Sequence, residues 1–551
     1  MNEEALFWAD QLAEDIISRK KYNYIDKEIK NPELLTVKSS TSISGVPHIG
    51  NASDVIRHDA VVRALRDRGK KVRFIWVAED MDALRKVPAG IPKSFEKYLG
   101  MPVADLPCPQ GCCKSYAEHF SRLFVDSLTK NFSTKPEYLS TAQTYRSGEF
   151  YPWIKKIMDN ISLVREIWNK SSKSPLSENW NPWKPVCENC GKLMTTEVIG
   201  RDNDAVNYVC SDYKFQKYEE DAYTSLKGCG HKGVSDIKKG NGKLLWRVEW
   251  GMLWAHWKII LEGAGKEHFM PTGSFWTAGE VCERVLNWPE PYPSENPLQP
   301  YEYLTIDSKK MSASVGNVVA TWEWPDFAPP QILRLLFLKR MKKVRDFSYT
   351  KIPDYVDEYD ELQKIFFGTK KLENKKEEAQ LKRLYEMIEI EIPKKLPPQI
   401  PFSFAAIIAQ ITKPEESLDR AIKLLKATGH IEKLDESEKK IILFRLITAK
   451  HWVDKYDMDR IKINATAPDL EISKEEKKAL AELKDDLEKQ WNEKDLQFRI
   501  YETSKHNNIP PKRFFQLLYQ IICSRDSGPR LGPFIITIGE EKVRKLLETL
   551  K

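Results

Sequence analysis

The chain has 551 residues, of which 41% are hydrophobic and 11% aromatic, so the composition predicts folded cores and excludes a disordered or fibrous protein. No apolar run is long enough to cross a bilayer and the amino terminus is acidic, so we expect a soluble, cytoplasmic protein without membrane association. The net charge of +7 permits nucleic-acid binding without establishing it. The length predicts about three domains.

The first unit of structure along the chain reads as strand, loop, helix and strand. An extended run from Leu34 leads to a loop at residues 46–51, and the amphipathic helix that follows is expected to begin with Ser53 or Asp54 as its cap. The apolar run at residues 72–78 has the length of a buried strand. A βαβ unit of this kind places its ligands beyond the carboxyl ends of its strands.

The loop at residues 46–51 has the features of a phosphate site. Gly45 and Gly50 remove side chains where the backbone meets the helix, and free N–H groups at a helix N-terminus, together with the helix dipole, favour an anion. His48 could donate a hydrogen bond to phosphate without carrying a fixed charge. Taken alone, the loop could equally be an ordinary βαβ turn with a satisfied histidine.

Three carboxylates follow the second strand. Glu79, Asp80 and Asp82 stand with Arg85 at the place where an α/β sheet usually holds its substrate. The alternative is a polar loop with surface ion pairs. Without further motifs the polar loop would be the simpler interpretation.

From residue 89 to about residue 242 the α/β rhythm breaks up, which predicts an insertion between two halves of a sheet. Its later part contains a tight CxxC turn followed by two further ligands, a strong pattern for a tetrahedral zinc site. The simplest ligand set is four thiolates, with His231 able to replace the last of them: Cys187, Cys190, Cys210 and Cys229. The alternative is a group of unrelated buried thiols.

An earlier cluster in the same region offers a second, weaker metal site. Three cysteines and a histidine fall within twelve residues, namely Cys108, Cys112, Cys113 and His119. Adjacent ligands are awkward within one tetrahedron. Both zinc sites would be structural, because neither leaves an open position for a substrate. Two remaining cysteines, Cys282 and Cys523, stand apart and are expected in the core.

Beyond residue 242 the pattern of a sheet resumes. Residues 243–250 read as a strand, residues 263–268 as a glycine-rich loop that a ligand approaches closely, and residues 274–286 as a helix. Residues 301–306 read as a strand that delivers the loop at residues 309–317. This region is therefore expected to complete the sheet.

The last third of the chain is predicted to be helical. Long amphipathic segments rich in Lys and Glu are separated by prolines, at residues 405–411, 417–426, 439–456, 474–500 and 511–523. Taken alone, the region would be a generic helical bundle whose charges form a solvated face.

Two motifs together carry a family resemblance. The loop Val46-Pro47-His48-Ile49-Gly50-Asn51 resembles the HIGH motif of class I aminoacyl-tRNA synthetases, and Lys309-Lys310-Met311-Ser312-Ala313-Ser314 resembles their KMSKS loop. Asn51, the carboxylate stretch 79–88, residues 265–268 and the run 528–534 are similar to class I lysyl-tRNA synthetases. The resemblance covers essentially the whole chain.

This resemblance implies an α/β fold with a Rossmann-type parallel-sheet catalytic domain, a zinc-bearing insertion and an all-α C-terminal domain. We expect the first half of the catalytic domain at residues 1–88, the insertion at 89–242, the second half at 243–325, a stem-contact linker at 326–360 and an anticodon-binding domain at 361–551.

The implied activity is that of a lysine–tRNA ligase, which activates L-lysine with ATP and Mg²⁺ and transfers it to tRNA(Lys). The implied catalytic residues are His48, Lys310 and Lys309. The implied ATP-binding residues are Pro47, His48, Gly50, Asn51, Lys310, Met311, Ser312 and Ser314. The implied amino-acid-binding residues are Ser40, Ser42, Asp80, Asp82, Trp246 and His268, with Glu249 as an alternative carboxylate for the lysine ammonium.

Two departures from the family and three alternatives remain at this stage. Ser40 and Ser42 match positions that touch the amino acid in this family, where Gly and Thr are common. Ala313 stands where many class I enzymes have Ser or Lys, so the second lysine of the motif is absent and Lys309 is the substitute. The alternatives are another class I synthetase or a non-tRNA nucleotidyltransferase of the same fold, and a zinc-bearing RNA-binding protein without catalysis. The sequence leaves the oligomeric state open, with a monomer favoured.

Overall fold

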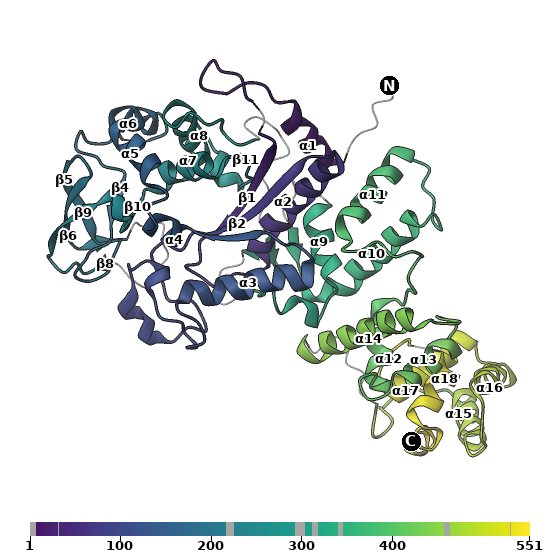
Figure 1. Cartoon of the computed structure of the whole chain (residues 1–551). Coiled ribbons are helices and arrows are strands. Elements are labelled where there is room, and N and C mark those ends of the chain that lie inside the picture. Colours follow the sequence, from purple (N-terminus) through teal and green to yellow (C-terminus); the bar gives the residue numbers. More distant parts are fainter. Residues whose placement is uncertain are drawn as a thin grey trace. The chain divides into compact units, whose positions relative to one another are not determined.

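The computed structural model describes residues 7–30, 32–172, 174–215, 225–292, 304–310, 318–339, 345–456, 463–528 and 530–550 (Figure 1). The chain divides into two compact units. The first consists of Met1–Glu323, Leu333–Phe347 and Glu373–Ile390, and the second of Trp324–Ile332, Ser348–Leu372 and Glu391–Lys551. None of the helices in these described ranges is long and apolar enough to cross a membrane.

A four-stranded parallel sheet forms the centre of the first unit. Its strands stand in the order β11–β1–β2–β3, with bounds Ile259–Leu261, Leu34–Thr41, Lys71–Ala78 and Glu137–Ser140. The chain runs outward from β1 through β2 to β3 and later returns to the other side of β1 for β11. This order is Rossmann-type, and its reversal beside β1 creates a switch point between β1 and β11. The predicted fold class is confirmed.

Helices connect the strands of this sheet. The connecting and neighbouring helices are α1 (Trp8–Ser18), α2 (Ile49–Asp67), α3 (Tyr116–Phe132), α7 (Trp246–Trp257) and α8 (Ser274–Arg284). Because β3 pairs with β2, the sheet extends to Ser140, beyond the boundary expected at residue 88. Sequence reading missed β3 because only four residues of it are extended.

The prediction of a strand over residues 243–250 is wrong for most of its length. The strand β10 ends at Leu244, and α7 begins at Trp246. Trp246, Trp250 and Trp254 recur every fourth residue, and their neighbouring ring centroids are 4.8 and 4.9 Å apart. This spacing is helical, since residues four apart share a helix face.

The insertion carries small antiparallel sheets and short helices, which Figure 1 shows as a separate group around β5, β6 and β9. Its helices are α4 (Thr141–Arg146), α5 (Tyr151–Asp159) and α6 (Ile161–Asn169). Its strands are β4 (Trp183–Pro185), β5 (Thr196–Asp202), β6 (Ala205–Cys210), β7 (Tyr213–Lys214), β8 (Ser225–Leu226), β9 (Lys232–Asp236) and β10 (Gly242–Leu244). The three strands β5–β6–β9 form its largest sheet.

A second small sheet presents the predicted lysine motif. The strand β12 (Leu304–Ile306) pairs antiparallel with β13 (Lys309–Lys310) and parallel with β14 (Arg345–Phe347). The helix α9 (Pro330–Leu338) lies between β13 and β14 in the sequence. The predicted strand at residues 301–306 is thus described only from Leu304 onward.

A buried arginine ties several helices of the first unit together. Arg334 of α9 is fully buried, and its guanidinium donates to the Asp59 carboxylate of α2 at 2.7 Å. It also donates to Thr134 Oγ1 at 3.1 Å and to the Met387 carbonyl of α11 (Lys375–Ile388) at 2.7 Å. Buried charge is tolerated where it is paired and fully hydrogen-bonded, as it is here.

The second unit is helical in its described part, as predicted. Its helices are α10 (Ile352–Phe366), α12 (Phe402–Thr412), α13 (Leu418–Ala427), α14 (Glu436–Tyr456), α15 (Lys474–Asp486), α16 (Glu493–His506), α17 (Pro511–Cys523), α18 (Leu531–Ile538) and α19 (Glu540–Glu548). The segment predicted at residues 474–500 is two helices, because α15 ends at Asp486 and the side chain of Asn492 caps α16.

Candidate active site

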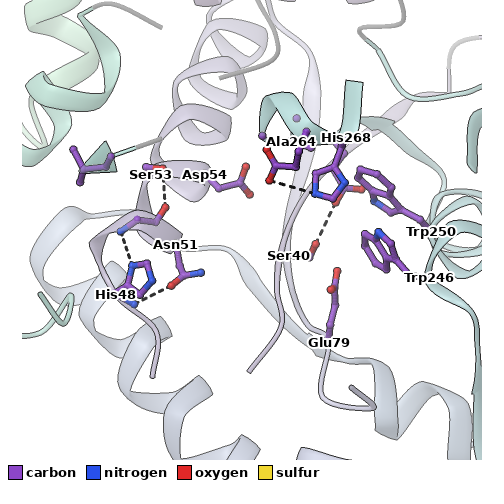
Figure 2. Close-up of a pocket in the computed structure, with 16 residues that line it drawn as sticks. Ser40, His48, Asn51, Ser53, Asp54, Glu79, Trp246, Trp250, Ala264 and His268 are labelled. Atoms are coloured by element: carbon purple, nitrogen blue, oxygen red, sulfur yellow. Dashed lines mark hydrogen bonds and ion pairs between the residues drawn. The ribbon is translucent and has the colours of Figure 1, made fainter. Parts of the chain in front are cut away.

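A cavity of about 360 Å³ opens at the switch point of the parallel sheet (Figure 2). Its wall is formed by Ser40 near the end of β1, by residues beyond β2 and β11, by the start of α2 and α7, and by Leu304 of β12. The lining residues include Ser40, His48, Gly50, Asn51, Ser53, Asp54, Glu79, Trp246, Trp250, Glu262, Gly265, Glu267 and His268. This is where a Rossmann-type sheet binds its ligand.

His48 begins α2, so the prediction that Ser53 or Asp54 caps this helix is wrong. His48 Nδ1 accepts from the Gly50 N–H at 3.0 Å, and the Asn51 side chain accepts from the His48 N–H at 3.0 Å. The two contacts form a reciprocal cap. Because Nδ1 accepts, the ring proton lies on Nε2, which can donate. Burial lowers the pKa of His48 to about 4, so the imidazole is neutral at pH 7.

Two of the N–H groups expected to be free at this helix start are already bonded. Gly50 donates to His48, and Ile49 donates to the Val319 carbonyl at 2.9 Å. His48 and Ala320 form an isolated antiparallel bridge. The segment that follows the lysine loop is thereby joined to the first motif. A phosphate here would accept a hydrogen bond from the His48 side chain and be favoured by the helix dipole, rather than bind a row of free amides.

A buried charge cluster forms one side of the cavity. The Lys38 ammonium of β1, fully buried, pairs with Glu262 at 2.5 Å and lies 4.0 Å from Glu79 Oε1. Ser40 donates to Glu262 at 3.2 Å. Burial raises the pKa of Glu79 to about 8, against the opposing influence of Lys38. Glu79 is therefore mostly protonated at neutral pH while the cavity is empty.

Two lining residues keep buried polar atoms without a hydrogen-bond partner among the described residues. They are Glu79 Oε1, an acceptor, and the indole N–H of Trp250, a donor. Figure 2 shows the Glu79 carboxylate directed toward Ser40, with the ring of Trp246 beside it. Since unpaired buried polar groups are costly, a ligand that offers both a cation and an acceptor would satisfy the cavity.

The aromatic side of the cavity comes from α7. The Trp246 and Trp250 rings stack at 4.8 Å with an interplanar angle of 24°, and His268 contacts the edge of Trp250 at 5.2 Å. His268 Nδ1 lies 2.8 Å from the Ser274 hydroxyl. Ser40, Trp246 and His268, all nominated from sequence, therefore lie around one cavity.

Asp80 lies outside this cavity, with its carboxylate already engaged. It accepts from Ser140 Oγ at 2.6 Å, from Thr141 Oγ1 at 3.0 Å and from the Ala142 N–H at 2.7 Å. These donors belong to the end of β3 and the first turn of α4. Asp80 thus holds α4 against the sheet, and it has little capacity left for a ligand.

Asp82 and the alternative Glu249 share an internal lysine. Lys243 Nζ lies 2.5 Å from Asp82 Oδ1 and 2.7 Å from Glu249 Oε2. Burial alone would lower the pKa of Lys243, but both ion pairs raise it. Burial opposes ionisation of Asp82, but the ion pair with Lys243 lowers the pKa of that carboxyl, and Ser42 contributes to the lowering. None of these residues lines the cavity.

A histidine of α2 fixes the glycine-rich loop. His58 Nε2 accepts from the Gly263 N–H at 2.7 Å, while its Nδ1 lies 2.7 Å from the Asp54 carbonyl. Asp54 in turn accepts from the Ser39 hydroxyl of β1. The loop, α2 and β1 are therefore held together at the edge of the cavity.

The lysine motif is only partly described. Lys309 and Lys310 form β13, paired with Ile306 and Thr305. Met311, Ser312 and Ser314 lie outside the described residues. Pro47, predicted to bind ATP, is buried directly before His48.

The four predicted zinc cysteines converge in the insertion. Cys187 and Cys229 have sulfurs 3.6 Å apart, those of Cys190 and Cys210 are 3.7 Å apart, and all four lie within 4.8 Å of one another. A tetrahedral zinc with bonds of about 2.3 Å separates its sulfurs by about 3.8 Å, so the set fits the ion. His231, the alternative ligand, instead contacts Glu188 at 3.1 Å.

The second cysteine cluster also converges. Cys112 Sγ lies 3.8 Å from Cys108 Sγ, 3.5 Å from Cys113 Sγ and 3.2 Å from His119 Nδ1, and all four ligand atoms lie within 4.8 Å of one another. The adjacent Cys112 and Cys113 thus reach one centre. The donors fit zinc.

Sequence reasoning missed the charged residues closest to the cavity. Glu79 was passed over for Asp80 and Asp82, Asp54 was considered only as a helix cap, and Lys38 and Glu262 were not considered. Glu79 and Glu262 are the first residues beyond β2 and β11. That position was the available signal, because strand ends at a switch point face the ligand.

Three features together define a class I aminoacyl-tRNA synthetase. They are the Rossmann-type sheet with its switch-point cavity, the histidine motif at that cavity, and the lysine motif on the β12–β13 hairpin. The profile of the family described as tRNA synthetases class I (K) matches residues 6–391, and the chain belongs to this family.

Several relatives match nearly the whole chain. Lysine–tRNA ligase of Pyrococcus furiosus is 34% identical over 555 residues, covering 98% of this chain and 99% of that protein. Lysine–tRNA ligases of Methanocaldococcus jannaschii and Methanosphaera stadtmanae are 33% and 31% identical, each covering 98% of both chains.

The cap made by His48 predicts a stability difference between two variants. His48→Ala removes the acceptor for the Gly50 N–H and should lower the free energy of unfolding by about 1 kcal/mol. His48→Asn keeps a side-chain oxygen at the cap and should stay close to wild type. Urea unfolding of both variants measures this, and equal losses in the two would contradict the capping role.

Proposed function

We propose that this chain is a lysine–tRNA ligase, which forms lysyl-adenylate from L-lysine and ATP and transfers the lysyl group to tRNA(Lys). The observation that carries the proposal is the Glu79 carboxylate, which has an unbonded oxygen beside two tryptophan rings in the switch-point cavity. The names of the relatives support the same substrate.

In the first step, a lysine carboxylate oxygen bonds to the α-phosphorus of ATP, and the bond to the bridging oxygen breaks to release pyrophosphate. Positioning and charge stabilisation dominate such a reaction. His48 Nε2–H donates to a phosphate oxygen, and Lys309 and Lys310 face the leaving pyrophosphate. Mg²⁺, when bound, shares the phosphate charge. The terminal ribose of tRNA then attacks the acyl carbon, and AMP leaves.

The lysine side chain is recognised by charge. Its ε-ammonium binds Glu79, which ionises on binding, while Trp246 covers the aliphatic stem. Ser40 and His268 contact the α-amino or carboxylate end, and the Trp250 N–H supplies a donor. A neutral isostere is rejected because it leaves Glu79 unpaired. Ser42, Asp82 and Glu249 shape the neighbouring wall through Lys243 rather than touching lysine.

The remaining parts of the chain contact tRNA or stabilise the fold. Residues 326–360 form the stem-contact linker, and residues 361–551, apart from Glu373–Ile390 of the first unit, form the anticodon-binding domain. Zinc bound by Cys187, Cys190, Cys210 and Cys229, and a second zinc bound by Cys108, Cys112, Cys113 and His119, stabilise the regions that carry them.

Pyrophosphate exchange tests the activity. With each of the twenty amino acids in turn, we expect ATP–pyrophosphate exchange to be fastest with lysine, since lysine matches both the carboxylate and the apolar stem site. Faster exchange with glutamate or arginine would refute the lysyl assignment. Exchange with lysine but no tRNA charging would favour a nucleotidyltransferase of the same fold.

Glu79 makes lysine binding pH-dependent. Its pKa near 8 means that the free site must lose a proton before it binds a cation. The KM for lysine should therefore fall as pH rises from 6 to 8, by about tenfold per unit, and level off above. Glu79→Gln should remove this slope and lower kcat/KM for lysine about 30-fold or more.

Glu267→Gln provides the matched control, because Glu267 is an exposed carboxylate that lines the same cavity. It should keep the slope and most of the affinity. A slope that persists in Glu79→Gln would assign the lysine ammonium to another group.

Metal analysis tests the zinc proposal. The purified chain should contain two zinc ions, and Cys187→Ser and Cys108→Ser should each lose one, because three ligands hold zinc far more weakly than four. Cys523→Ser, which changes a buried cysteine outside both clusters, should keep both ions. Zinc-free native protein would rule out both sites.

A further inference from the structure

The hairpin that presents the lysine motif turns through two residues in the left-handed region. Asp307 has φ +46° and Ser308 has φ +64°, and they join β12 to β13. A two-residue hairpin turn with positive φ at both positions is typically built from Asn or Asp followed by Gly, because glycine adopts this conformation freely. Asp307 suits the first position, whereas Ser308 stands where glycine is preferred and disfavours the conformation.

Asp346 of the neighbouring strand β14 accepts hydrogen bonds from this turn. Its Oδ1 accepts from the Ser308 N–H at 2.7 Å and from Thr305 Oγ1 at 2.8 Å, and its Oδ2 accepts from Ser308 Oγ at 3.2 Å. The Asp307 N–H donates to the Phe347 carbonyl at 3.0 Å. Hydrogen bonds to an ionised acceptor are among the stronger ones, so they offset the cost of the turn.

The turn sets the register of the lysine pair. In the observed register Lys309 lies opposite Ile306 and Lys310 opposite Thr305. A slip by one residue would exchange the faces on which Lys309 and Lys310 lie. The two lysines act in catalysis only if this register is kept, and Leu304 at the other end of β12 lines the cavity.

We propose that Asp346 is a positioning residue for adenylate formation. It acts through Ser308 and Thr305, holding the hairpin in the register that directs the lysine pair to the leaving pyrophosphate. It does not touch substrate. This rests on the proposed function, and it adds a residue that stands 36 positions beyond Lys310, outside the motif itself.

The test is loss and rescue. Asp346→Ala should lower kcat for exchange with lysine about 10- to 100-fold, because a small misplacement of catalytic groups is costly, with the KM for lysine unchanged. Ser308→Gly should behave like wild type. The double variant Asp346→Ala/Ser308→Gly should recover most of the lost kcat, since glycine adopts the turn without assistance.

Asp435→Ala is the matched control. Asp435 is also an exposed carboxylate with three local hydrogen bonds, from the Ser437 N–H, the Ser437 hydroxyl and the Glu438 N–H. It caps a helix of the second unit, and its loss should leave kcat for exchange unchanged. An equal loss in Asp435→Ala would show that Asp346 acts only through general stability, and would overturn the proposal.

The failure of this proposal can be told apart from failure of the proposed function. If wild-type protein supports no exchange with lysine, the function fails. Hydrogen exchange at the Ser308 amide still tests the hairpin, and should accelerate in Asp346→Ala. Any of three results would overturn the positioning role. The first is a wild-type kcat in Asp346→Ala, and the second is an impaired Asp346→Ala that Ser308→Gly does not rescue. The third is an unchanged rate of hydrogen exchange at the Ser308 amide.

Discussion

The buried ion pair between Lys38 and Glu262 is the contact on which the cavity depends. It joins β1 to the residue directly beyond β11, and these are the two neighbouring parallel strands at the switch point. Trp254 also donates to Glu262. Burying two ions costs several kcal/mol each, and an apolar pair of similar volume is often as stable, so folding alone does not require these residues. Lys38 and Glu262 instead set the net charge of the cavity. With Glu79 ionised, two carboxylates share one ammonium, and one negative charge remains for a ligand.

The other side of the cavity depends on α2. Its start is capped by His48 and bonded through Ile49 to Val319, which follows the lysine loop in sequence. Its middle carries Asp59, which pairs with the buried Arg334 of α9. One helix thus connects the histidine motif to segments on the far side of the lysine loop. Because helix packing is close and poorly compressible, the relative placement of the two motifs is set by the core of the first unit.

Local patterns predicted what depends on local physics. The βαβ unit follows from apolar runs and strand length. The Cys187 set follows from spacing, because a CxxC turn fixes two ligands by itself, and the Cys108 set follows from four donors within twelve residues. The start of α2 was misplaced because histidine is an uncommon cap, whereas Ser53 and Asp54 are common ones. In the sequence, Asp80 and Asp82 have the same chemistry as Glu79 and nearly the same place beyond β2. Only the fold shows that Asp80 is bonded to α4 and Asp82 to Lys243, a partner 161 residues away.

The first unit buries an ammonium twice in the same way. Lys38 lies between Glu262 and Glu79, and Lys243 lies between Glu249 and Asp82, so each lysine has two carboxylates. Each group carries one negative charge when its acids are ionised, which makes this side of the site attractive to a cation and repulsive to ATP. The proposed function therefore assigns the nucleotide phosphates to the opposite side, toward the neutral His48, the dipole of α2 and the lysine hairpin. In that proposal, the division of charge orients two substrates of opposite sign toward a common reaction centre. Glu79 remains mostly protonated until a cation arrives, because burial raises the pKa of its carboxyl and the nearby Asp82 adds to the rise.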